Sequence, residues 1–117
     1  MEYAITSNSQ HVTVVTYAPG FTRPSCASCD FNPVDGVWWI NRVVVEPQRA
    51  RKRGIGSALL RRLVEEVQRY GGLIRVTPGG YSLDTEGQIR FYEMNGFVRV
   101  EDLDDRYMEY RGIPDEK

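Results

Sequence analysis

The sequence predicts an α/β fold of the mixed α+β type, with two helices and one partly parallel sheet. Two observations support this prediction. Residues 57–70 repeat apolar side chains at helical spacing, and they lie between β-like runs at 37–46 and 73–77. The other β-like segments are short, β-branched and bounded by turn-forming residues. Because a strand, a helix and a strand in this order form a crossover between parallel strands, we expect the sheet to be partly parallel.

The N-terminal part of the chain predicts a hairpin and then a long loop. The run from His11 to Tyr17 is β-branched and partly alternating, and Glu2 to Thr6 is a weaker strand candidate. Residues 18–36 are rich in Pro, Gly, Ser and Asp, which favours a loop. Residues 37–46 are a near-continuous run of Val, Trp and Ile, typical of a strand covered on both faces. We place the central strand there.

The C-terminal part predicts two helices that alternate with strands. The helix at 57–70 is stopped by Gly71-Gly72, and a second helix runs from Asp84 or Thr85 to Asn95 before Gly96. The predicted strands here are 73–77, 97–100 and 106–110. The predicted order is therefore ββ, loop, βαβαββ.

Length and composition fit one soluble domain spanning residues 1–117. The chain is 41% hydrophobic and 26% charged, which is ordinary for a globular protein. Fifteen Lys and Arg against sixteen Asp and Glu leave a net charge of −1, so no global basic field favours nucleic acid or an anionic membrane. The N-terminus resembles no signal peptide and no apolar run could cross a bilayer. We expect a cytoplasmic protein.

The two cysteines, Cys26 and Cys29, form a CxxC motif inside the predicted loop. A structural zinc site needs two further good ligands, and His11 is the single histidine of the chain. We therefore expect two reduced thiols in a surface loop and no metal.

A short segment between the central strand and the first helix predicts an anion site. It reads Arg51-Lys52-Arg53-Gly54-Ile55-Gly56, and its two glycines let successive main-chain N–H groups converge. The helix N-terminus adds unpaired amides and the positive end of its dipole. The alternative is a tight turn flanked by solvated Arg and Lys. The spacing of the two glycines excludes a P-loop. The segment also lacks the third glycine of a dinucleotide-binding fingerprint.

Two motifs together resemble the GNAT family of acetyltransferases. Val43-Val44-Val45-Glu46-Pro47 followed by Arg51-x-x-Gly54-x-Gly56 resembles the family's motif A, and Phe91-Tyr92-Glu93-Met94-Asn95-Gly96-Phe97 resembles its second signature. The likeness covers residues 37–110. It implies a sheet that splays open between 37–46 and 73–77, with acyl-CoA in the cleft.

The resemblance also implies roles for individual residues. The main chain of Val43 to Val45 would bind pantetheine, and the glycine loop would hold the pyrophosphate. Thr85 stands where many members have a CoA-contacting Asn. The residues so assigned to acetyl-CoA, the expected co-substrate, are Val43, Val44, Val45, Arg51, Lys52, Arg53, Gly54, Ile55, Gly56, Ser57 and Thr85.

The implied reaction, attack of an amine on a thioester, needs an acid for the thiolate and a proton acceptor for the amine. Tyr92 would be the general acid; its alternative role is a core aromatic. The positions where family members carry a glutamate base correspond to Gly80 and Trp39, and neither is acidic. Glu46 is a weak candidate base, and a proton path through water is equally open.

The main departure from the family is that no helices are predicted between the hairpin and the central strand. An open cleft suits a lysine or N-terminus of a protein, although a second copy of the chain in a homodimer could complete the wall. In lacking these two helices, the sequence resembles small phage-encoded acetyltransferases. The alternatives are acetylation of a small, polyamine-like amine, or a GNAT-fold binding module without turnover.

Overall fold

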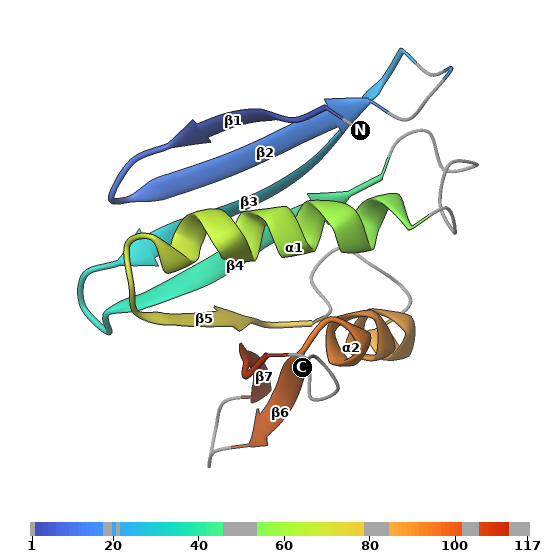
Figure 1. Cartoon of the computed structure of the whole chain (residues 1–117). Coiled ribbons are helices and arrows are strands. Elements are labelled where there is room, and N and C mark those ends of the chain that lie inside the picture. The colour runs from blue at the N-terminus through green and yellow to red at the C-terminus, as the bar shows by residue number, and fades with distance from the viewer. Residues whose placement is uncertain are drawn as a thin grey trace.

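The computed structural model describes residues 2–17, 20, 22–45, 54–78, 85–101 and 106–112 of the chain. This part forms one seven-stranded sheet and two helices (Figure 1). The elements in chain order are β1 Ala4–Ser7, β2 His11–Tyr17, β3 Pro24–Asn32, β4 Val37–Val44, α1 Ile55–Gln68, β5 Leu73–Val76, α2 Thr85–Met94, β6 Phe97–Glu101 and β7 Arg106–Tyr110.

The sheet has the strand order β1-β2-β3-β4-β5-β7-β6. β4 and β5 are parallel and are connected by α1, whereas all other neighbours are antiparallel. The predicted mixed sheet with two helices is therefore confirmed. Most predicted elements begin and end within two residues of the observed ones, since their hydrophobic periodicity is strong.

The prediction of a loop over residues 18–36 was wrong, because it contains the nine-residue strand β3. β3 pairs with β2 from Pro24 to Asp30 and with β4 from Cys26 to Asn32. Three of its inward side chains are small, and these, Ser25, Ala27 and Cys29, are fully buried. Small and polar residues have low intrinsic strand preference, but pairing on both edges overrides that preference.

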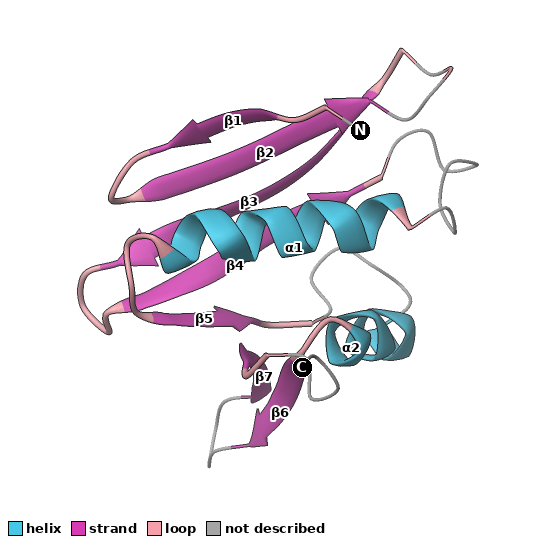
Figure 2. Ribbon diagram, in the orientation of Figure 1, coloured by secondary structure: helices cyan, strands magenta, loops and turns pink. Residues whose placement is uncertain are grey.

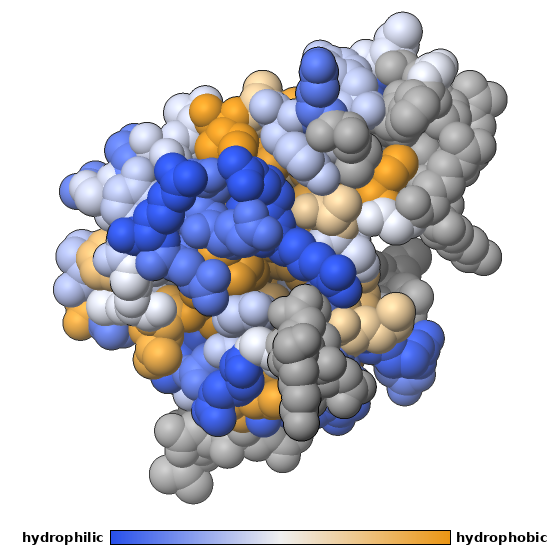
Figure 3. All heavy atoms as spheres, viewed as in Figure 1, coloured by the Kyte–Doolittle hydropathy of each residue, from blue (hydrophilic) through white to orange (hydrophobic). Residues whose placement is uncertain are grey.

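The hydrophobic core lies between the sheet and one side of α1. Leu59, Leu60, Leu63 and Val67 are at most 1% exposed and pack toward β2, β3 and β4. Burying each such side chain contributes roughly 1.5–3 kcal/mol. The outer side of α1 is hydrophilic in Figure 3. No helix in the described ranges is long and apolar enough to cross a membrane.

Both helices pack on the same face of the sheet (Figure 2). α2 meets the start of α1, where a Cβ atom on Gly56 would lie 3.4 Å from the Phe91 ring. No described helix covers the opposite face, which we call the open face. Cross-strand partners share a face, and one row of partners on the open face is His11, Asp30, Trp39, Arg75, Glu109 and Val98.

Candidate active site

The candidate site begins where β4 and β5 separate. The two strands pair from Val37 with Leu73 to Trp39 with Arg75. β5 then ends at Val76, whereas β4 continues to Val44 beside β3. On the β5 side, the main chain of residues 41–44 therefore has no strand partner within the described ranges. Its N–H and C=O groups can bind an extended ligand.

A β-bulge in β4 lies at the start of this gap. Cys29 pairs with Ile40 and Ser28 pairs with Arg42, so Asn41 is the extra residue. A bulge bends its strand and increases the local twist, which is consistent with the separation of β4 from β5. Sequence reasoning missed the bulge. The available signal was the polar pair Asn41-Arg42 within an otherwise apolar run.

The N-terminus of α1 faces the same region. Gly54 is its N-cap with φ 76°, a left-handed conformation that favours glycine, and no side chain caps this end. The first helical hydrogen bond runs from the Ala58 N–H to the Gly54 carbonyl oxygen at 3.0 Å. The amides of residues 55–57 therefore have no partner within the helix. Together with the helix dipole, they favour binding of a phosphate.

Gly56 brings three elements into contact at this helix end. A Cβ atom at this position would lie 3.4 Å from Val45 Cγ2, just after β4, and 3.4 Å from Phe91 on α2. These are ordinary van der Waals distances for a Cβ atom, so alanine would fit here and only a longer side chain would displace the neighbours. The structure thus brings Val45 and Gly56, both predicted site residues, next to the second motif.

Asn95 fixes α2 to the start of α1, a role that sequence reasoning did not assign. Its side chain is 2% exposed. The Nδ2 group donates to Ser57 Oγ at 3.1 Å and to the Phe91 carbonyl oxygen at 2.8 Å. Its Oδ1 accepts a bond from Arg61 Nε at 3.4 Å. The signal was present in the sequence, since Asn95 lies inside the quoted second motif.

Tyr92 is both a core residue and the candidate donor to a departing thiolate. It is 6% exposed, and its ring packs edge-on against Phe91 and Phe97 at centroid distances of 5.2 and 5.4 Å. Burial raises the pKa of Tyr92 to about 12. The hydroxyl therefore stays protonated at neutral pH and can donate a hydrogen bond.

The remaining predicted site residues lie in several different parts of the chain. Val43 packs against the core, and Val44 lies at the end of β4. Thr85, at the start of α2, lines a cavity of about 210 Å³ together with Arg99 and Tyr107. Glu46, Arg51, Lys52 and Arg53 lie outside the described residues.

The two cysteines lie in β3, so the prediction of thiols in a surface loop was wrong. Both are free thiols, and they point to opposite faces because three positions separate them along one strand. Cys29 is buried beneath α1. Burial, with the nearby Asp30 charge, raises the pKa of its thiol to about 12. Within the described ranges, no group of three or more His, Cys, Asp or Glu side chains could hold a metal.

Comparison with known proteins agrees with this geometry. The family model for the acetyltransferase (GNAT) domain matches residues 8–99, and the chain therefore belongs to the GNAT family. No curated protein matches the sequence.

Solved structures of acetyltransferases share the fold. Aminoglycoside 6′-acetyltransferase type Ii is 26% identical with a TM-score of 0.68, over 93% of this chain and 74% of that one. A GNAT acetyltransferase from Staphylococcus aureus is 15% identical with a TM-score of 0.67, over 87% and 68%. The PaiA N-acetyltransferase from Thermoplasma acidophilum, solved with coenzyme A, is 17% identical with a TM-score of 0.66, over 87% and 61%.

Membership of the GNAT acetyltransferase family supports acetyl-CoA as the co-substrate. The residues around the gap fit such a molecule. The strand edge of β4 can bind an extended pantetheine arm, and the amides at the start of α1 can bind phosphates. The protein is therefore an acyl-CoA acetyltransferase by family.

Proposed function

We propose that the protein transfers an acetyl group from acetyl-CoA to a primary amine of another protein, a lysine side chain or an N-terminus. The observation that carries this proposal is the gap between β4 and β5, which the described helices flank on one face only. Acetyl-CoA would enter from the helix side. The amine would then approach from the open face, where no described helix would enclose a small molecule.

The proposed binding of acetyl-CoA divides between two elements. Main-chain groups of Val43 to Val45 would hold the pantetheine arm in the gap. Amides of residues 54–57 would hold the pyrophosphate, with Arg51, Lys52 and Arg53 supplying charge at its edge. Thr85 would contribute a hydroxyl from α2.

Tyr92 would donate a hydrogen bond to the thiolate as the C–S bond breaks. With a pKa of about 12 the phenol is a weaker acid than a thiol, whose ordinary pKa is about 8.5. Complete proton transfer is therefore unfavourable before the ligand is bound. Stabilisation of the developing charge by a hydrogen bond is the role that this environment supports. Glu46 stays a predicted weak base.

Titration calorimetry with acetyl-CoA, followed by thiol release in the presence of amines, tests the proposal. The amines are lysine peptides, peptides with a free N-terminus only, a polyamine and an aminoglycoside. We expect micromolar binding and thiol release with one of the peptide classes. Thiol release with only the polyamine or the aminoglycoside would show that the acceptor is a small amine and not a protein. Binding without release for any amine would support a binding module.

A further inference from the structure

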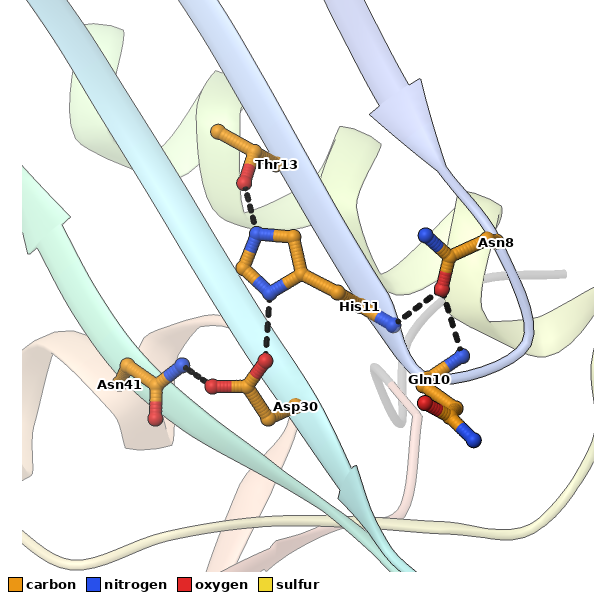
Figure 4. A network of polar contacts seen from close by, with 6 residues as sticks. All are labelled: Asn8, Gln10, His11, Thr13, Asp30 and Asn41. Carbon is orange, nitrogen blue, oxygen red and sulfur yellow. Dashed lines mark hydrogen bonds and ion pairs between the residues drawn. The ribbon is translucent and has the colours of Figure 1, made fainter.

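A hydrogen-bonded network of polar residues lies on the open face, across β2, β3 and β4 (Figure 4). His11 Nδ1 and Asp30 Oδ1 are 2.5 Å apart, and His11 Nε2 and Thr13 Oγ1 are also 2.5 Å apart. The Asn41 side-chain amide donates to the second oxygen of Asp30. The network therefore extends from the bulge in β4 to the start of β2.

The partners of His11 fix its tautomer and its position. An ionised carboxylate can only accept, so Nδ1–H donates to Asp30, and Nε2 accepts from the Thr13 hydroxyl in the neutral ring. The main chain is also fixed, since Asn8 Oδ1 accepts bonds from the N–H groups of Gln10 and His11 at 2.8 and 2.9 Å. The side chain of His11 is still 41% exposed, so water can reach it.

The network begins at the gap in which the thioester would lie. Asn41 is the bulge residue of β4, and Asp30 pairs with Trp39, the last β4 residue bonded to β5. Neighbouring strands are about 4.8 Å apart, so His11 on β2 lies roughly 10 Å from β4 along the sheet. Two or three waters over β3 would span this distance.

We propose that His11 accepts the proton which the amine substrate must lose before it attacks acetyl-CoA, and that Asp30 and Asn41 are positioning residues for it. The proposal rests on the proposed function. It supplies the proton acceptor that the sequence lacks at the two positions where family members carry a glutamate, Gly80 and Trp39.

The substrate ammonium loses one proton before the acyl group is transferred. One N–H bond of the ammonium breaks, and its proton passes through water and the Thr13 hydroxyl to His11 Nε2. The neutral amine then forms the C–N bond as the C–S bond breaks. The second proton of the nitrogen ends on the thiolate sulfur. His11 returns its proton to solvent, which leaves the amide, free coenzyme A and one proton.

Asp30 is suited to hold an imidazolium rather than to accept the proton itself. The hydrogen bond from His11, with a smaller one from Asn41, lowers the pKa of Asp30 despite partial burial. It is therefore ionised at neutral pH, where histidine is the side chain that ordinarily changes charge. Other charged residues that the register places on this face are Arg42, in the row of Thr13 and Ser28, and Arg75 and Glu109, in the row of Asp30. The described β1 residues carry no charge.

The pH dependence of kcat/KM in His11→Asn tests the proposal, with a lysine peptide or whichever amine releases thiol. Near pH 7 we expect a loss of about 10²-fold, typical of a missing general base. The loss should shrink toward the amine pKa, about 10.4 for lysine, because the substrate is then already neutral. Asp30→Asn should lower kcat/KM near pH 7, because the Nδ1–H group of His11 loses its carboxylate partner and the ring is held less firmly.

Three further measurements make the test decisive. The single histidine gives one imidazole NMR signal, and its titration midpoint should match that of the wild-type kinetic profile. Gln10→Ala is the control variant and should behave as wild type, because the Gln10 side chain points away from the network in Figure 4. Acetyl-CoA affinity and melting temperature should be unchanged in His11→Asn.

The outcomes separate this inference from the proposed function. A His11→Asn variant with the wild-type profile, or with the same loss at every pH, would overturn the role of His11 while leaving the transferase intact. A wild-type protein that releases no thiol with any amine would instead overturn the proposed function, and this inference with it.

Discussion

At the scale of single residues, burial separates two kinds of functional group. Tyr92 is enclosed by Phe91 and Phe97 and keeps its proton, whereas His11 stands half-exposed beside an ionised carboxylate. A buried phenol can stabilise a developing charge, and an exposed imidazole can exchange protons with water. The two groups therefore suit the opposite ends of the same transfer, the leaving sulfur and the entering amine.

Replacing Tyr92 by Phe should lower kcat without weakening acetyl-CoA binding. The ring and its core contacts are kept, and only the hydroxyl is lost. Since general acid and hydrogen-bond contributions of one group reach about 10²-fold or more, we expect a loss of that order in kcat. Steady-state kinetics and calorimetry measure the two quantities. Equal kcat values for Tyr92→Phe and wild type would make Tyr92 a purely structural aromatic.

At the scale of elements, the site depends on the contact between α1 and α2. Gly56 allows the close approach and Asn95 holds it, so the phosphate-binding end of α1 and the helix of Tyr92 are joined by one buried side chain. This contact should therefore be sensitive to small changes.

Replacing Asn95 by Ala should destabilise the fold and also weaken acetyl-CoA binding. The change leaves the Phe91 carbonyl and the Ser57 hydroxyl without this donor, which costs about 1–3 kcal/mol for a buried group. Urea unfolding measures the stability, with Met94→Ala as the control, because Met94 is 73% exposed on the same helix. If Asn95→Ala were as stable to urea as Met94→Ala, the hydrogen bonds of Asn95 between the helices would not contribute to stability.

At the scale of the whole molecule, the strongly patterned elements could be predicted and β3 could not. Helix α1 has apolar residues at helical spacing, and strand β4 is a nearly continuous apolar run. Both patterns can be recognised from residues that are neighbours in the sequence. β3 is recognisable only by its two partner strands, since its buried residues include Ser25 and Ala27. Its assignment requires contacts between residues far apart in sequence.

The same distinction applies to the candidate site. The glycine turn and the motif around Tyr92 are local, so their residues could be named in advance. The His11 network joins residues 19 positions apart in the sequence, and Asp30 lay in a segment assigned to a loop. The bulge at Asn41 likewise depends on the register between β3 and β4, which no local pattern reports.

The seam between β5 and β7 should make the fold sensitive to acid through Glu109. Burial would raise the pKa of Glu109, but hydrogen bonds from Arg75 and Arg111, at 2.9 and 2.6 Å, outweigh burial and leave it lowered. A lowered native pKa stabilises the fold above the unfolded value, about 4.3. That stability is lost as pH falls from there through the native pKa.

We therefore expect Glu109→Gln to melt at a lower temperature than wild type at pH 7, with the difference shrinking below about pH 4.3. Thermal melting from pH 7 to pH 2 measures it. Glu65→Gln is the matched control, because Glu65 is 63% exposed in its pair with Arg62 and should contribute little. A difference independent of pH would exclude titration of Glu109 as its cause.

The position of the CxxC motif in a strand has a consequence for oxidation. Cys26 and Cys29 project to opposite sides of the sheet, so no oxidant can close a ring between them without unfolding β3. Cys29 is sealed in the core. Any disulfide formed by the folded protein must therefore join Cys26 to another molecule, and a dimer on a non-reducing gel would indicate that two open faces had met.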